Sequence, residues 1–180
     1  TVGYKGSKRK LLHMILDYAT EIGAKTAFDG FSGTGIVSAH LRSNGLITSA
    51  NDLNYSSYIY GRVFLEGFNE DVVSRHLEVM NKITPVDGWL TKNYSGTVNR
   101  LVRGTGERSD RPLGLIGPNA MKIDAARDYV DSLVDIDDRD RNALIFSTIL
   151  GLASVFNNPT DQKSAFKNWS KASLKEVSFN

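Results

Sequence analysis

The sequence predicts an α/β fold that starts with a nucleotide-type cofactor site and continues into a mainly helical region. A short buried strand, Thr26–Phe28, leads into a glycine-rich turn, Asp29–Gly35. A helix over Ile36–Asn44 and a second strand over Leu46–Ala50 follow, and this strand ends just before Asp52. This order of strand, glycine turn, helix, strand and acid is typical of sites that bind nucleotide-like cofactors.

The turn and the acid explain why such a site binds a nucleotide. Glycines let the backbone approach a ligand where a Cβ would collide, and the following helix begins with unpaired N–H groups. Gly33-Thr-Gly35 alone is a weak signal, because Ser38 stands where a third glycine is expected. Asp52 could accept hydrogen bonds from ribose hydroxyls, or it could cap the next helix. For Asp29 the alternative is a turn-capping role, and Phe31 taken alone favours core packing.

Composition excludes several classes of protein. The 180 residues are 41% hydrophobic and 23% charged, as in an ordinary globular chain. The absence of cysteine excludes disulfides and thiolate metal sites, and no metal site is expected. No apolar run approaches the roughly 20 residues that span a bilayer, and no signal-peptide pattern opens the chain, so no membrane partner is expected. The net charge of +2 does not by itself indicate nucleic acid.

A basic segment, Tyr4–Lys10, precedes the first strand. Ser7 is a plausible N-cap for a helix that Gly23 ends, with Leu12, Ile15 and their helical neighbours on one face. The segment is either a solvated basic tip or a loop that covers a ligand, and its place before the cofactor strand favours the loop.

Helical periodicity dominates after Asp52. Helices are expected over Ser56–Glu66, Asp71–Ile83, Asn119–Val134 and Asn142–Phe156, the last at the centre of a second core. His76 has no acid at metal spacing and is expected at the surface. The composition changes after Pro85, which divides the chain into a cofactor-binding part (1–85), a mainly helical region (86–175) and a short alternating segment (176–180) that would return to a strand.

Basic residues gather in the second region. Residues 96–117 contain four arginines against Glu107 and Asp110, with five glycines between them. Lysines recur at four-residue steps from Lys163 to Lys175. The arginine-rich segment could be a flexible loop, and the lysines could line a solvated helix face. Alternatively, both could contact phosphates. The candidate DNA-binding residues are Lys92, Arg100, Arg103, Lys122, Lys163 and Lys167.

Three motifs in order resemble the Dam-like class of adenine-N6 DNA methyltransferases, which use S-adenosylmethionine. Tyr4-Lys-Gly-Ser-Lys8 is similar to the aromatic-x-Gly-Gly-Lys motif of that family. Phe28-Asp-Gly-Phe-Ser-Gly-Thr-Gly35 resembles its acid-Pro-Phe-x-Gly-x-Gly turn, and Asn51-Asp-Leu-Asn54 its Asn/Ala-Asp-hydrophobic-Asn motif. More loosely, Gly88-Trp89 and residues 119–127 resemble its inserted target-recognition region.

The resemblance implies a cofactor role for residues of all three motifs. Asp29 and Phe31 would lie near the methionine part, Asp52 would hold the ribose hydroxyls and Leu53 would flank the adenine. Ser7 in place of glycine and Gly30 in place of proline depart from the family pattern. The implied cofactor-binding residues are Tyr4, Gly6, Ser7, Lys8, Asp29, Gly30, Phe31, Ser32, Gly33, Gly35, Asp52 and Leu53.

The resemblance also implies the fold and the reaction. The fold would be part of a Rossmann-like methyltransferase sheet with an inserted, mainly helical recognition subdomain. The substrate would be adenine flipped out of double-stranded DNA, in a bacterial or phage-type cytoplasm near the nucleoid, with a companion restriction nuclease as a further partner. Catalysis in the family uses an Asp/Asn-Pro-Pro-Tyr/Phe motif, which these residues lack.

We therefore expect an N-terminal part of a methyltransferase, with the catalytic motif beyond Asn180, no catalytic residue and no methyl transfer by this chain alone. The alternative is a non-catalytic nucleic-acid-binding module that kept the fold. A Rossmann dehydrogenase is disfavoured, because a third glycine is missing and the chain turns helical after residue 70.

Overall fold

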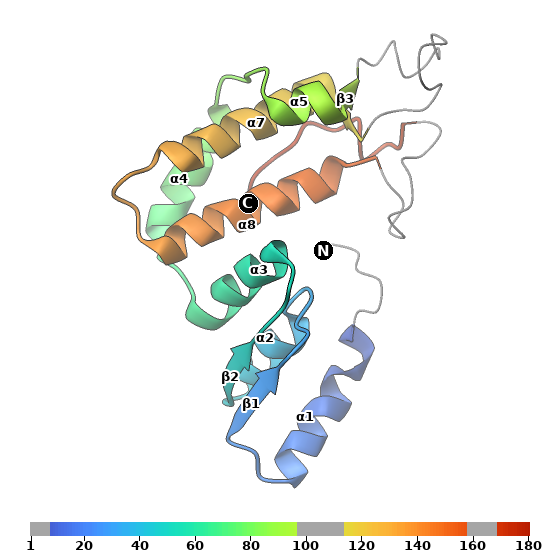
Figure 1. Ribbon diagram of the computed structural model, residues 1–180, viewed down its shortest axis with the longest axis vertical. Helices are drawn as coiled ribbons and strands as arrows, with labels where there is room; N and C mark the ends of the chain where they lie inside the picture. Colours follow the sequence, from blue (N-terminus) through green and yellow to red (C-terminus); the bar gives the residue numbers. More distant parts are fainter. Residues whose placement is uncertain (1–7, 97–113, 158–168) are drawn as a thin grey trace. The chain divides into compact units, whose positions relative to one another are not determined.

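The computed structural model describes residues 8–96, 114–157 and 169–180, which divide into two compact units (Figure 1). The first unit holds the described residues up to Asn69 together with Asp137–Phe146. The second holds those of 70–136 and 147–180. The predicted boundaries at residues 85 and 175 remain predictions about the complete protein.

The first unit is an α/β arrangement around two parallel strands. Its elements are η1 (Arg9–Leu11), α1 (Leu12–Glu21), β1 (Thr26–Asp29), α2 (Ile36–Ser43), β2 (Ile47–Ala50) and α3 (Tyr55–Glu66). In the sheet, Thr26 lies opposite Ile47 and Asp29 opposite Ala50. The predicted α/β class is confirmed, and the predicted element ends agree with the structure to within one or two residues.

The strands are more exposed than the sequence predicts. Thr26–Phe28 was expected to be buried, but Phe28 is 72% exposed and Ile47 on β2 is similarly open. The prediction of a buried strand is therefore wrong for the described residues. The physical reason is that the sheet has only two strands within the described part of this unit, so its apolar side chains lack the neighbours that further strands supply.

The core of the first unit forms between α3 and the first turns of α8 (Asp138–Val155). Ile59 and Tyr60 are buried, and the rings of Tyr60 and Phe64 both make edge-to-face contacts with Phe146, at centroid distances of 5.3 and 5.5 Å. Such aromatic pairs contribute about 0.5–1.5 kcal/mol beyond their buried area. The glycine turn between β1 and α2 rests on this aromatic core through Phe64.

The second unit consists mainly of helices. Its elements are α4 (Glu70–Lys82), α5 (Trp89–Tyr94), β3 (Ser95–Gly96), β4 (Leu115–Ile116), α7 (Gly117–Ser132) and the remainder of α8. β3 and β4 pair in parallel, and α5 lies along α7 (Figure 1). Met80, Ile123 and Val130 supply buried side chains from α4 and α7. Among the described helices, none has the length and apolarity needed to cross a membrane.

His76 on α4 is half-buried rather than fully exposed. The imidazole Nδ1 lies 2.7 Å from the Tyr129 hydroxyl, which joins α4 to α7. The prediction of a surface histidine is correct only in part, because the side chain is half-buried beside a hydroxyl on a helix 53 residues away.

The final residues form an extended segment without strand pairing among the described residues. Val177 and Phe179 are buried while their neighbours face outward, as the alternating sequence predicts, but the expected strand does not form. The Asn119 amide donates to the Lys175 carbonyl (2.7 Å) and accepts from the Val177 N–H (3.0 Å). The Asn81 amide likewise donates to the Phe179 carbonyl (2.7 Å) and accepts from the Phe179 N–H (2.9 Å). Two side chains thus replace a strand partner.

The lysines near the end do not form the predicted helical row in the described residues. Lys171 and Lys175 lie in turns between residues 169 and 175. Lys163 and Lys167 lie outside the described residues.

Candidate functional site

The glycine turn after β1 has a conformation that few residues other than glycine adopt. Gly33 and Gly35 have φ values of 53° and 70°, in the left-handed region. The Gly35 N–H donates to the Ser32 carbonyl at 2.8 Å, and α2 begins at the next residue. A Cβ on Gly35 would lie 2.9 Å from the Phe64 ring. Glycine is therefore required here by both backbone conformation and space.

Asp52 joins this turn to the end of β2. Its Oδ2 accepts from the Gly33 N–H at 2.8 Å, and its Oδ1 accepts from the Asn54 N–H at 2.9 Å. These backbone hydrogen bonds, that from Asn54 first, lower the pKa of the Asp52 carboxyl below its ordinary value of 3.8. The Ser57 hydroxyl and the Leu53 N–H lower this pKa further, so the side chain, which is ionised at neutral pH, stays an anion to lower pH than an ordinary aspartate.

The alternative role for Asp52, as the N-cap of the following helix, is wrong. α3 begins at Tyr55, and Asn54 caps it by accepting from the Ser56 N–H at 3.0 Å. Asn54 has the extended backbone that an N-cap requires. The cap and the acid are thus separate residues, which sequence reasoning did not distinguish.

Asp29 is fixed at the end of β1 by a residue that the sequence pattern marked only as a missing glycine. The Ser38 hydroxyl, buried on α2, donates to Asp29 Oδ2 at 2.7 Å. The Asn51 N–H donates to the Asp29 carbonyl at 2.8 Å, which continues the β1–β2 ladder. Ser38 therefore orients the Asp29 carboxylate. In the sequence, the sign of this contact was a hydroxyl side chain in the first turn of the predicted helix.

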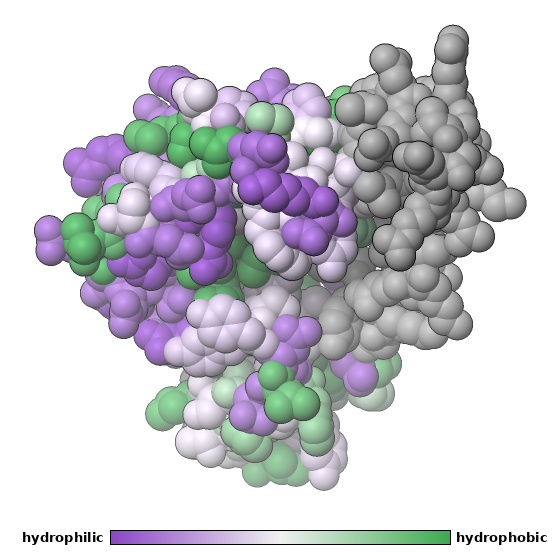
Figure 2. Space-filling model, turned by 45° about the horizontal axis from the view of Figure 1, so that its top comes forward, coloured by the Kyte–Doolittle hydropathy of each residue, from purple (hydrophilic) through white to green (hydrophobic). Residues whose placement is uncertain are grey.

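Two hydrophobic side chains stand open beside the carboxylates. Phe31, in the turn after β1, is 96% exposed, and Leu53, directly after Asp52, is fully exposed. The space-filling view shows hydrophobic side chains open to solvent between polar ones (Figure 2). The preference for Phe31 as a core residue is wrong, because its side chain is almost fully exposed.

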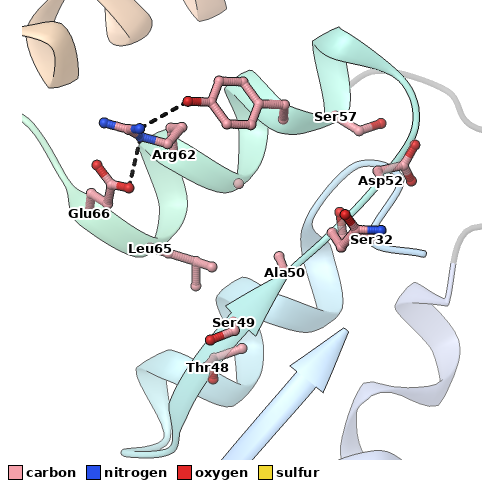
Figure 3. Close-up of a pocket in the computed structure, with 12 residues that line it drawn as sticks. Ser32, Thr48, Ser49, Ala50, Asp52, Ser57, Arg62, Leu65 and Glu66 are labelled. Atoms are coloured by element: carbon pink, nitrogen blue, oxygen red, sulfur yellow. Dashed lines mark hydrogen bonds and ion pairs between the residues drawn. The ribbon is translucent and has the colours of Figure 1, made fainter. Parts of the chain in front are cut away.

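A cleft of about 450 Å³ runs between β2 and α3 (Figure 3). At one end Asp52 and Ser57 face it, and at the other Arg62 donates to the Tyr58 hydroxyl at 2.9 Å and pairs with Glu66 at 2.7 Å. The lining residues are Ser32, Thr48, Ser49, Ala50, Asn51, Asp52, Ser57, Tyr58, Gly61, Arg62, Leu65 and Glu66. Of the predicted cofactor residues that the structure describes, only Ser32 and Asp52 line this cleft.

The remaining predicted cofactor residues fall into three sets. Gly30, Phe31, Gly33 and Leu53 lie with Asp29 around the carboxyl ends of β1 and β2. Lys8 is exposed and directly precedes η1. Tyr4, Gly6 and Ser7 lie outside the described residues.

The predicted DNA-binding residues are not gathered in one place by the described structure. Lys92 is exposed on α5. Lys122 is only 7% exposed, and its ammonium contacts Glu176 at 2.7 Å, which lowers the pKa of that glutamate. Arg100, Arg103, Lys163 and Lys167 lie outside the described residues. Within the described ranges no group of three or more acids and histidines is placed to hold a metal ion.

Comparison with known proteins places the glycine turn and the acid in a family context. A model of the D12 class N6 adenine-specific DNA methyltransferase family matches residues 4–98. The type II methyltransferase M.NlaIII of Neisseria lactamica is 26% identical over 186 residues, which cover 98% of this chain and 53% of that protein. The chain thus spans about half the length of this curated relative. No solved structure matches the chain significantly.

Proposed function

Because the chain belongs to the D12 class N6 adenine-specific DNA methyltransferase family, we propose that the protein transfers a methyl group from S-adenosylmethionine to the N6 of adenine in DNA. The observation that carries this proposal is the hydrogen bond from Gly33 to Asp52 at the ends of two parallel strands. In this proposal, residues 1–85 are part of a Rossmann-like sheet and 86–175 form an inserted, mainly helical recognition region.

The residues around the glycine turn fit this cofactor. Asp52 would accept hydrogen bonds from the ribose hydroxyls, since both of its oxygens keep acceptor capacity. The exposed Leu53 would cover one face of the adenine, and the exposed Phe31 would pack against the methionine part. Asp29, held by Ser38, would receive the methionine ammonium. Lys8, Gly30, Ser32, Gly33 and Gly35 would border the cofactor.

The chemistry of this transfer depends on alignment. S-adenosylmethionine supplies a methyl group on a positively charged sulfur, and the enzyme must hold the adenine amino nitrogen in line with it. The Asp/Asn-Pro-Pro-Tyr/Phe motif that would hold the amino group is not present among these 180 residues. We therefore propose a cofactor-binding role for these residues and assign the alignment of the amino group to none of them.

The acceptor in this proposal is an adenine flipped out of double-stranded DNA, and the protein would act beside a companion restriction nuclease. Lys92, Arg100 and Arg103 would contact phosphates, with Lys163 and Lys167 as further candidates. Lys122 would have to leave Glu176 to take part. The number of such contacts can be estimated by measuring DNA affinity at several salt concentrations, because affinity falls more steeply with salt as more phosphates are neutralised.

Calorimetry with S-adenosylmethionine tests the cofactor assignment. The chain should bind it, and Asp52→Ala should weaken binding at least 10-fold, because the ribose hydroxyls lose a charged acceptor. Asp17→Ala, an exposed acid on α1, is the matched control and should bind normally. Unchanged binding by Asp52→Ala would show that the cofactor lies elsewhere.

The second candidate is a non-catalytic DNA-binding module with a methyltransferase-like fold. Methyl transfer from labelled S-adenosylmethionine to unmethylated DNA, measured with the complete gene product, separates the two. The proposed enzyme labels adenine at N6. The alternative module binds DNA without labelling it.

A further inference from the structure

We propose that α5 is a DNA-contacting element in which the Trp89 ring stacks on an unpaired base while Lys92 binds a neighbouring phosphate. The inference rests on the proposed function, which makes DNA the partner. It goes further by assigning the contact to one short helix and by naming the two kinds of interaction.

The first observation is that α5 is anchored rigidly despite its six residues. The carboxylate of Asp124, which is buried on α7, accepts from the N–H groups of Leu90 (2.9 Å) and Thr91 (2.8 Å) and from the Thr91 hydroxyl (2.6 Å). Three hydrogen bonds to one buried anion are among the stronger contacts that a protein forms. The orientation of α5 on α7 is therefore fixed before any ligand arrives.

Gly88 makes this close approach feasible. A Cβ on Gly88 would lie 2.5 Å from Asp124 Cγ, so any larger residue would push α5 away from the carboxylate. At the other end of α5, the Ser95 hydroxyl donates to the Thr91 carbonyl at 2.6 Å. Both ends of the helix are thus held, which preorganises the side chains between them.

The second observation is what the anchored helix presents. Trp89 is 66% exposed, and its ring lies 5.4 Å from that of Tyr94, which is also exposed. A tryptophan has a large apolar surface that normally contributes to a core. Leu90 and Thr91 of α5 are half-buried and hydrogen-bonded to Asp124 on α7, whereas the two aromatic rings are exposed.

The third observation concerns charge. Lys92 follows Trp89 by three residues, so the two side chains lie on neighbouring positions of one helix face. Lys92 is exposed. A flat aromatic surface beside a lysine matches a nucleotide with its base unstacked, because the ring can stack on the base and the ammonium can donate hydrogen bonds to the phosphate. A fully stacked duplex offers phosphates but no free base face.

Tryptophan fluorescence reports this contact directly, because the chain has two tryptophans and Trp169→Phe leaves Trp89 as the only one. The full chain with Trp169→Phe is titrated with a duplex carrying one extrahelical thymine, which is not the methyl acceptor, and with the fully paired duplex. We expect quenching and tighter binding with the extrahelical base. Trp89→Ala should weaken that binding about 10-fold, the effect of losing one stacked base, while Trp89→Phe should retain most of it.

Lys92→Ala should weaken binding to both duplexes and lower the slope of log K against log salt by about 1. Lys82→Ala on α4 and Tyr18→Ala on α1 are the matched controls for an exposed lysine and an exposed aromatic ring, and neither should change affinity. Circular dichroism verifies that each variant is folded.

The outcomes separate this inference from the proposed function. If Trp89→Ala binds the duplex with the extrahelical thymine as well as the parent does, α5 is not the stacking element, although the family function stands. If the folded parent binds neither duplex, the inference fails together with the DNA part of the proposed function. Calorimetry with S-adenosylmethionine then decides the cofactor part independently.

Discussion

Asp52 shows how much of this site depends on single side chains. The carboxylate accepts one backbone hydrogen bond from the glycine turn and one from the segment after β2, so it closes the two ends of the sheet into one structure. The same two contacts keep it ionised. A residue with this geometry serves the fold and a ligand at once, and the two roles can be separated by experiment.

Replacing Asp52 with Asn keeps the size of the side chain but removes its charge and one acceptor. One of the two N–H groups, of Gly33 or Asn54, then faces an amide donor. Because the site is partly exposed, we expect a loss of about 1 kcal/mol in the free energy of unfolding and roughly a 10-fold or greater loss of S-adenosylmethionine affinity. Urea denaturation and calorimetry measure the two effects, with Asp17→Asn as control. A stability loss without an affinity loss would make Asp52 purely structural.

The lowered pKa of Asp52 also predicts a pH dependence. A carboxyl whose pKa is depressed in the folded protein contributes stability that is fully present above its unfolded pKa near 3.8 and is lost as pH falls through the folded value. Asp52 therefore contributes equally at pH 8 and pH 5, and the difference in stability between the parent and Asp52→Asn should be constant over that range. Denaturation at several pH values checks this, and a difference that shrinks between pH 8 and pH 5 would contradict it.

At the scale of elements, the turn between β1 and α2 and the short helix α5 share one design. Each is a segment with little regular hydrogen bonding of its own, held by a carboxylate from a distant part of the chain. Asp52 binds the turn, and Asp124 binds α5. Each also needs a glycine where a Cβ would collide, Gly35 and Gly88.

Gly35→Ala should destabilise the first unit by about 1–3 kcal/mol, because it combines a left-handed φ with a clash against the Phe64 ring. Gly45 offers a matched control. It also has a positive φ, of 89°, but no atom within 4 Å of an added Cβ. Gly45→Ala should therefore report the backbone strain alone. Thermal unfolding compares them, and equal losses would show that the contact with Phe64 yields without cost.

Asp124→Ala should loosen α5 without unfolding the first unit. Two backbone N–H groups and a hydroxyl lose their acceptor, with an expected cost of about 2–4 kcal/mol in the second unit. Amide hydrogen exchange at Leu90 and Thr91 should accelerate while exchange in α3 stays slow. Asp128→Ala on the same helix, at an exposed position, is the control. Slow exchange at Leu90 in Asp124→Ala would show that the packing of α5 on α7 suffices.

The elements of the first unit were predictable from sequence, because strands, turn glycines and helical periodicity are local signals. The helix bounds of α2 and α3 agree with the structure to within one residue. Burial was less predictable. Phe28 and Phe31 carry apolar side chains into open positions, and only the number of neighbouring strands and the direction of the turn decide this. The assembled partners Ser38–Asp29 and His76–Tyr129 were beyond sequence reasoning, since they connect different elements.

At the scale of the whole molecule, the chain forms two units that divide α8 between them. The first unit carries the proposed cofactor residues and the second carries α5 and the extended final segment. In the second unit the last residues are tied back by Asn81 on α4 and Asn119 on α7. The integrity of that unit therefore depends on its final six residues.

Asn119→Ala should release this segment. The buried amide makes hydrogen bonds to Lys175 and Val177, and its loss leaves a buried N–H and a carbonyl unpaired, at a cost of about 2–4 kcal/mol. Limited proteolysis should then cleave after Lys175, which the parent should resist. Ser178→Ala, on the outward side of the same segment, should behave as the parent. Resistance in Asn119→Ala would show that burial of Phe179 alone holds the segment.

The asparagine contacts also constrain the order in which the chain folds. They join residues 58 and 98 positions apart, so the closing contacts of the second unit are among the longest-range in the molecule. Contacts of such separation form late and slow the folding of a domain. On a ribosome, α4, α5 and α7 leave the exit tunnel well before Val177 and Phe179 do. The second unit would therefore wait, incomplete, until the segment that follows α8 has been synthesised, whereas β1, α2 and β2 can assemble from neighbouring sequence alone.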